Sequence, residues 1–115
     1  MMKHNVRAAS GVAILDLNGE VDISDASELR KILFDLLDKY AGRLLVNMGS
    51  VAYIDSAGLS VLIAAHRRAN STKGVLGLSN LQIPVQQVLN LTRMSNVLHT
   101  FSTVEEGVAA LKNDT

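Results

Sequence analysis

The chain has 115 residues, no cysteine, and 11 lysines and arginines against 11 aspartates and glutamates, so its formal net charge is zero. This length predicts a single domain over residues 1–115, and the balanced charge argues against a nucleic-acid partner, which usually goes with a basic excess. Because there is no cysteine, disulfides and thiolate metal sites are excluded. No apolar stretch approaches the length of roughly 20 residues that a membrane-spanning helix needs, so we expect a cytoplasmic protein with no membrane span.

The first third of the chain changes from a strand pattern to a helical one. Apolar residues on both faces predict a strand over 12–17, with Gly19 at its end or at a bulge, and an extra strand is expected in front. Asp25 and Glu28 have the spacing of a capping box, which predicts a helix start. Apolar residues then recur at three- and four-residue steps until Gly42, which is typical of the end of a helix.

The middle of the chain repeats this alternation. A short apolar run predicts a strand over 43–48, and the backbone is expected to stay extended over 51–55. Helical spacing returns over 57–70, and the next apolar run predicts a buried strand over 74–79.

The last third completes the pattern. A helix is predicted over 83–91, with Pro84 tolerated in its first turn, and a short strand over 97–101. Thr103 and Glu106 form a second capping-box pattern before a final helix. The whole order predicts an α/β fold, with a mixed, largely parallel sheet of four to five strands flanked by about four helices.

Ser56 stands where an extended run turns into a helix, at the end of the sheet where α/β folds usually place their sites. In one interpretation, which the spacing alone favours, Ser56 is the N-cap of a helix that starts at Ala57. In the other, Ser56 carries a phosphate, which a helix N-terminus favours and which adds about −1.5 to −2 charges beside Asp55. Gly58 supports the second interpretation, because glycine in a first helical turn costs about 0.5–1 kcal/mol and leaves the backbone open to close approach by a partner.

The helix after Ser56 carries two rows of side chains. One row is apolar and is predicted to face the core. It comprises Leu59, Leu62 and Ile63, with His66 as an optional further member. The other row is small and weakly polar, so it either receives a partner helix or packs against the protein's own sheet. It comprises Ala57, Ser60, Ala64 and Arg68, with Val61 at its edge.

Two segments, residues 17–33 and 43–69, together resemble the STAS domain of bacterial anti-sigma factor antagonists. The most specific element is Asp-Ser-Ala-Gly-Leu at 55–59, and Asn-Gly-Glu-Val-Asp at 18–22 is a weaker marker in the right order. The similarity extends over nearly the whole chain, from about Val12 to Leu111, and implies a STAS-like fold.

The resemblance implies a partner switch in place of an enzyme. In this family the unphosphorylated antagonist binds an anti-sigma factor that is also a serine kinase of the histidine-kinase-like ATPase type. Phosphorylation releases the antagonist, and a serine phosphatase resets it. Carried over, Ser56 is the phosphoacceptor, ATP belongs to the partner, and the chain needs no cofactor of its own. The residues expected at the partner-binding site are Asp22, Asp55, Ala57, Gly58, Leu59, Ser60, Val61, Ala64 and Arg68.

Two positions depart from the commoner family pattern. Asn47 stands where an Asp often ends the strand before the motif, which is expected to make the site less acidic. Ser60 stands where many relatives have Gly, and its hydroxyl is a rival phosphoacceptor that fits the motif less well than Ser56 does.

A hydrolase, a metal site and a structural subunit are the alternatives to the switch. A hydrolase would need Gly-x-Ser-x-Gly around Ser56, and His66 is ten residues along the helix, about 15 Å away by helical rise. Asp22 and Asp25 have no His or Cys cluster to complete a metal site. The remaining alternative is a STAS-type structural or scaffold subunit of a transporter-associated or stress-signalling complex, which the sequence does not separate from the switch.

Overall fold

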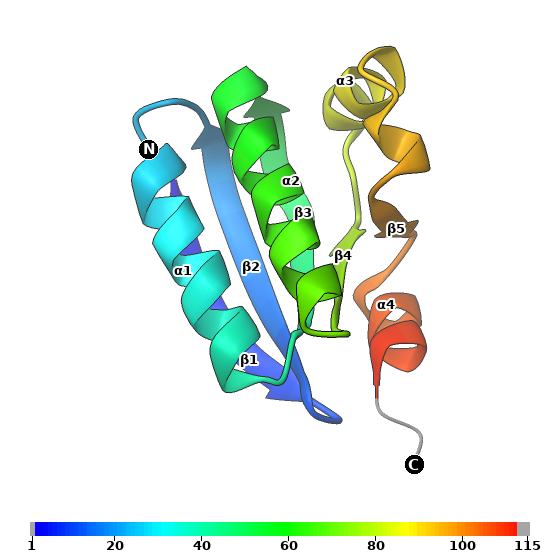
Figure 1. The fold of residues 1–115 in the computed structure, drawn as a ribbon. Coiled ribbons are helices and arrows are strands. Elements are labelled where there is room, and N and C mark those ends of the chain that lie inside the picture. The colour runs from blue at the N-terminus through cyan, green and yellow to red at the C-terminus, as the bar shows by residue number, and fades with distance from the viewer. Residues whose placement is uncertain (1, 113–115) are drawn as a thin grey trace.

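Residues 2–112, which the computed structural model describes, form a five-stranded sheet in the order β1-β2-β3-β4-β5 (Figure 1). The strands are β1 (Lys3–Ala9), β2 (Val12–Val21), β3 (Arg43–Ile54), β4 (Val75–Ser79) and β5 (His99–Phe101). β1 is antiparallel to β2, and every other neighbouring pair is parallel. The predicted mixed, largely parallel sheet with an extra strand at the front is therefore confirmed.

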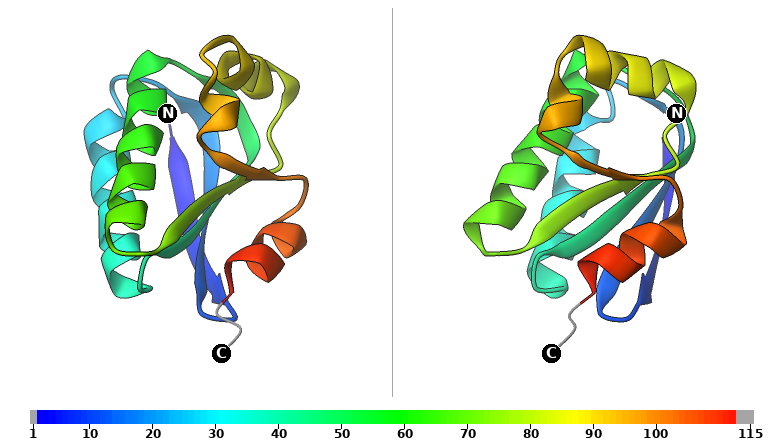
Figure 2. Two further views of the ribbon diagram at one scale, coloured as in Figure 1. Left: turned by 45° about the vertical axis from the view of Figure 1, so that its right-hand side comes forward. Right: turned by 90° about the vertical axis from the view of Figure 1, so that its right-hand side faces the viewer.

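Helices cover the two faces of this sheet unequally. The helices are α1 (Ala26–Lys39), α2 (Ser56–Ser71), α3 (Ile83–Leu91), the short 3-10 helix η1 (Met94–Asn96) and α4 (Val104–Leu111). The first three pack on a shared main core, whereas α4 packs on a small second core on the opposite face (Figure 2). Two layers of helices thus enclose a central sheet, as α/β folds require.

The alternation of side chains along the inner strands creates these two cores. Leu15 of β2 and Val46 of β3 point into the main core, while Val12 and Leu45, on the other face, meet Leu111 of α4. Strands buried on both faces read as continuous apolar runs. This is why the apolar runs in the sequence predicted the inner strands.

β3 is longer than the sequence predicted. The two extended runs at 43–48 and 51–55 are one strand that continues to Ile54. β2 follows it through register shifts, one of which lies between Gly19 and Glu20, and Gly19 has a φ of 105°. The bulge interpretation of Gly19 is confirmed, because that backbone conformation strongly favours glycine.

Of the two predicted capping boxes, one forms in part: the Thr103 cap is present, but the Glu106 carboxylate accepts from the N–H of Ser102 at 3.2 Å and not from that of Thr103. Thr103 accepts a hydrogen bond from the N–H of Glu106 at 3.1 Å and caps α4, as predicted. Asp25 lies at the N-cap position of α1 but makes no capping bond, because its carboxylate accepts from the N–H of Asp22 at 3.3 Å. The capping box predicted for Asp25 and Glu28 is therefore wrong, since the preceding loop competes for the same carboxylate.

Candidate functional site

The loops that follow β2 and β3 lie side by side at the carboxyl ends of these parallel strands (Figure 1). Val21 and Ile54 are register partners, so Asp22 and Asp55 each follow a paired residue. The N–H of Asp55 donates to the Val21 carbonyl at 3.1 Å, which holds the two loops together. Asp22 therefore lies at the same end of the sheet as Ser56, as expected.

Asp55, and not Ser56, is the N-cap of α2. Its Oδ1 accepts from the N–H of Gly58 at 2.9 Å, and its Oδ2 accepts from the N–H of Ile23 at 3.1 Å. The cap that the sequence placed at Ser56 is wrong by one residue, and α2 begins at Ser56. A carboxylate has two acceptor oxygens, so Asp55 can cap the helix and also fix the β2–α1 loop, which a hydroxyl could not do in the same way.

Ser56 is exposed on the first turn of α2. Within residues 2–112, no group forms a hydrogen bond to its hydroxyl, and its carbonyl accepts from the Ser60 hydroxyl at 2.8 Å. The two serines therefore differ: the Ser60 hydroxyl is bonded to its own helix, whereas the Ser56 hydroxyl is free at the helix start, where anions are favoured.

Gly58 is buried against the protein's own sheet. A Cβ at this position would lie 2.9 Å from Val21 Cγ1 and 2.9 Å from Ile54 Cγ1. The interpretation that Gly58 leaves the backbone open to a partner is therefore wrong. Glycine is required here because the first turn of α2 crosses closely over the ends of β2 and β3.

The remaining predicted residues of α2 divide between core and surface. Leu59 and Val61 belong to the main core, and Val61 is only 7% exposed. The placement of Val61 at the edge of a partner-facing row is therefore wrong. Ala57 and Ala64 are half-buried, and Arg68 is exposed but engaged elsewhere in its own chain.

Arg68 connects α2 to α1. Its guanidinium bonds Asp38 at 3.0 Å and lies 5.3 Å from the ring centroid of Phe34. The second row of α2 is thus split: its end near Ser56 is accessible, while its far end packs against the protein itself.

Asp22 adds a stable negative charge near Ser56. Its Oδ1 accepts from the backbone N–H of Ser24 at 2.9 Å and from the hydroxyl of Ser24 at 2.5 Å. Hydrogen bonds from the Ser24 hydroxyl and then its N–H lower the pKa of Asp22 from its ordinary value, so the carboxylate is ionised at neutral pH.

Two exposed apolar residues, Ile23 across the loop contact and Tyr53 in β3, close to Ser56 in the chain, were not predicted as site residues. Ile23 is 76% exposed and is held by Asp55 through its N–H, and Tyr53 is 50% exposed near the end of β3. The position of a large apolar residue between Asp22 and Ser24 could have indicated an exposed apolar group, because the helical pattern of α1 does not account for it. Large exposed apolar groups next to a polar site are common at protein interfaces.

Asn47 lies away from the Ser56 turn. It is inside β3, and more than half of that strand, roughly 20 Å at the usual rise per residue, separates it from Ile54. Its amide donates to Asp16 Oδ1 at 2.8 Å, and Arg7 donates to Asp16 Oδ2 at 2.9 Å. The hydrogen bond from Arg7 is the main cause that lowers the pKa of Asp16. Asn47 does not end its strand, so that expectation is corrected.

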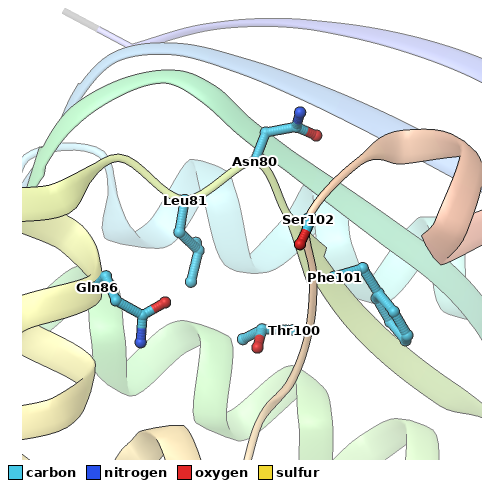
Figure 3. Close-up of a pocket in the computed structure, with 6 residues that line it drawn as sticks. All are labelled: Asn80, Leu81, Gln86, Thr100, Phe101 and Ser102. Atoms are coloured by element: carbon cyan, nitrogen blue, oxygen red, sulfur yellow. The ribbon is translucent and has the colours of Figure 1, made fainter.

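A separate surface hollow of about 320 Å³ lies between β5 and α3 (Figure 3). Leu81, Gln86 and Thr100 face it, and no ionisable side chain lines it.

His66 is buried on α2, with its Nε2 3.1 Å from the Asn70 amide nitrogen. Among residues 2–112 there is no group of three or more His, Cys, Asp or Glu residues that could hold a metal. None of the described helices combines the length and hydropathy that crossing a membrane requires.

A family model and several relatives match the chain. The STAS domain model matches residues 3–107. A Bordetella bronchiseptica protein, provisionally named the anti-sigma factor antagonist BtrV, is 28% identical over 111 residues, which are 96% of each chain. The anti-sigma-B factor antagonist of Bacillus subtilis is 28% identical over 94 residues, which are 82% of this chain and 85% of that protein.

Solved structures agree with these matches. The crystal structure of a Thermotoga maritima protein, provisionally described as an anti-sigma factor antagonist, has a TM-score of 0.88 and 26% sequence identity. The alignment covers 94% of this chain and 93% of that one. The arrangement of strands and helices described above is therefore similar to that of the Thermotoga maritima protein.

Proposed function

This chain belongs to the STAS domain family, and from that premise we propose that it is an anti-sigma factor antagonist controlled by phosphorylation of Ser56. In the unphosphorylated state it binds an anti-sigma factor in the bacterial cytoplasm and so releases a sigma factor. The anti-sigma factor, a serine kinase of the histidine-kinase-like ATPase type, transfers a phosphoryl group from ATP to Ser56 and the complex separates. A serine phosphatase then restores the binding form. The chain is a substrate in this cycle and performs no catalysis.

The observation that carries this proposal is the division of roles between Asp55 and Ser56. Asp55 supplies the cap bond to Gly58 and the bond to Ile23, so the turn keeps its shape without the Ser56 hydroxyl. That hydroxyl is exposed and free of hydrogen bonds from residues 2–112. A phosphoryl group can therefore be added without breaking a bond that holds the fold.

The charge of that phosphoryl group would change the surface strongly. It adds about −1.5 to −2 charges at neutral pH, next to Asp55 and near the ionised Asp22. Within the protein the N-terminus of α2 offsets part of this charge. A partner that buries the site would have to remove water from a group with several negative charges, which is costly without a matching cation.

The contact surface that we propose is centred on Ser56. Ile23 and Tyr53 supply exposed apolar area, and Ala57 and Ser60 supply small side chains on the first turns of α2. The buried members of the predicted set, Gly58, Leu59 and Val61, support this surface from below, and Ala64 and Arg68 lie at its margin. Apolar anchors around a hydroxyl give a contact that one added charge can disrupt.

The proposal is tested by incubating the protein with ATP and a candidate anti-sigma factor kinase, followed by peptide mass mapping. We expect one added phosphoryl group, located at Ser56, and no modification of Ser56→Ala. Ser60→Ala is the matched control, because it removes the rival hydroxyl on the same helix and should be modified normally.

Phosphorylation at Ser60, or at any site other than Ser56, would contradict the proposal. A protein that binds a partner stably but is modified by no kinase of this type would instead support the scaffold subunit.

A further inference from the structure

Within residues 2–112, β1 is an edge strand whose outer side pairs with no other strand. It pairs only with β2, and the burial pattern of Lys3–Ala9 shows six exposed residues followed by one half-buried residue. Val6, at its centre, is 41% exposed. A seven-residue edge made mostly of exposed residues is a template for pairing with another strand.

The turn between β1 and β2 determines which backbone groups point outward. Ser10 and Gly11 form a two-residue turn with φ values of 54° and 78°, close to type I′, and Ala9 is the register partner of Val12. The residues that flank such a turn exchange backbone hydrogen bonds. In an antiparallel pair the residues alternate between bonding the partner strand and pointing their backbone groups away from it. The N–H and C=O groups of His4, Val6 and Ala8 therefore point away from β2.

We propose that β1 pairs with β1 of a second copy of this chain, antiparallel and with the twofold axis at Val6. The two five-stranded sheets would then join into one continuous sheet across the new contact. In this register the outward-facing backbone groups of the two copies meet: Val6 pairs with Val6, and His4 pairs with Ala8 of the second copy. All seven residues of β1 take part.

The charges on β1 select this register. With the axis at Val6, Lys3 lies opposite Ala9 and Arg7 lies opposite Asn5 of the second copy, so no like charges face each other. Moving the axis to Asn5 places Lys3 opposite Arg7, and moving it to Arg7 places two arginines opposite each other. Like charges directly opposite are destabilising in an antiparallel pair. Arg7 is in addition already paired with Asp16 at 2.9 Å.

This inference does not depend on the proposed function, because β1 contributes no residue to the Ser56 turn. A single cysteine tests it in a chain that has none of its own. In the Val6→Cys variant the two Cα atoms would lie about 5.5 Å apart in the pair, which suits a disulfide. In Ala8→Cys, the control on the same face, the two cysteines would be offset by four residues, roughly 13 Å.

We expect mild oxidation to cross-link Val6→Cys at least about tenfold faster than Ala8→Cys, because only the first variant holds its thiols at high effective concentration. Equal rates for the two variants would overturn the proposal.

Sedimentation gives an independent test without oxidation. The unmodified protein should show a mass that rises with concentration toward that of a dimer. Val6→Pro should stay monomeric, because it removes the outward N–H while sparing the ladder with β2. Val6→Thr keeps that N–H and should behave like the unmodified protein. A monomer at all concentrations, or a dimer that survives Val6→Pro, would show that this edge is not the contact.

Discussion

Asp55 and Ser56 separate two tasks that adjoin at the start of α2. The Asp55 carboxylate stabilises the turn through the N–H groups of Gly58 and Ile23, and the Ser56 hydroxyl is left for chemistry. The sequence placed a polar pair at this turn correctly. It did not show which residue was the cap, because Ser and Asp are nearly equal in that role. Only the path of the β2–α1 loop, which supplies the Ile23 N–H, decides in favour of Asp55.

Asp55→Ala should therefore destabilise the protein, whereas Ser56→Ala should not. We expect the first variant to lose about 1–2 kcal/mol of unfolding free energy, since it removes a cap and a loop bond. The matched control Ser56→Ala should stay within about 0.5 kcal/mol of the unmodified protein. Urea unfolding measures both values. Equal losses in the two variants would show that Ser56 shares the capping role.

Gly58→Ala should reduce stability, although alanine is the better helix former. The added Cβ would come within 2.9 Å of Val21 and Ile54 side chains, and overpacking of this kind costs typically about 1–3 kcal/mol. Ser60→Ala, on the exposed side of the same helix, should have little effect. Thermal unfolding of the two variants checks this. A stabilised Gly58→Ala would mean that the crossing of α2 over β2 and β3 is looser than described.

At the scale of elements, α2 is buried over a wider arc than its apolar row predicted. Leu59, Leu62 and His66 face inward as expected, but Gly58 and Val61 are also buried. The reason is that α2 contacts both the sheet and α1, where Arg68 meets Asp38. Periodicity describes one face of a helix and cannot say how many neighbours the helix has.

The contact between α2 and β5 should make stability depend on pH. His66 is 8% exposed, its Nδ1 has no partner among residues 2–112, and the His99 ring lies 5.8 Å away. Burial, followed by the charges of His99 and Arg67, lowers the pKa of His66 below its ordinary 6.5. The unfolded chain thus binds a proton more readily than the folded protein does. Stability should be highest above pH 6.5 and should fall as the pH drops below that value.

Urea unfolding between pH 5 and pH 8 measures this dependence. His66→Gln should flatten the pH profile in that range, whereas His4→Gln, a control on exposed β1, should leave the profile unchanged. A profile that is unaltered by His66→Gln would contradict the assignment.

For the whole molecule, the order of strands and helices could be predicted because buried strands and amphipathic helices have different periods. The continuous β3 could not, since Gly49 and Ser50 interrupt its apolar run and only pairing with β2 keeps the backbone extended there. The exposed β1 was foreseen only as an extra strand in front. Its polar composition resembles a loop, and its hydrogen bonds to β2 define it.

The central claim is that charge on Ser56 ends partner binding while the fold stays intact. Calorimetric titration of the cognate anti-sigma factor with the unmodified protein, the Ser56-phosphorylated protein and Ser56→Ala tests it most directly, with a thermal melt of each form. We predict similar affinities for the unmodified protein and Ser56→Ala. The phosphorylated form should bind at least about tenfold more weakly, which is equivalent to about 1.4 kcal/mol of binding free energy. All three forms should have closely similar melting temperatures. Tight binding by the phosphorylated form, or a phosphorylated form that is unfolded, would contradict it.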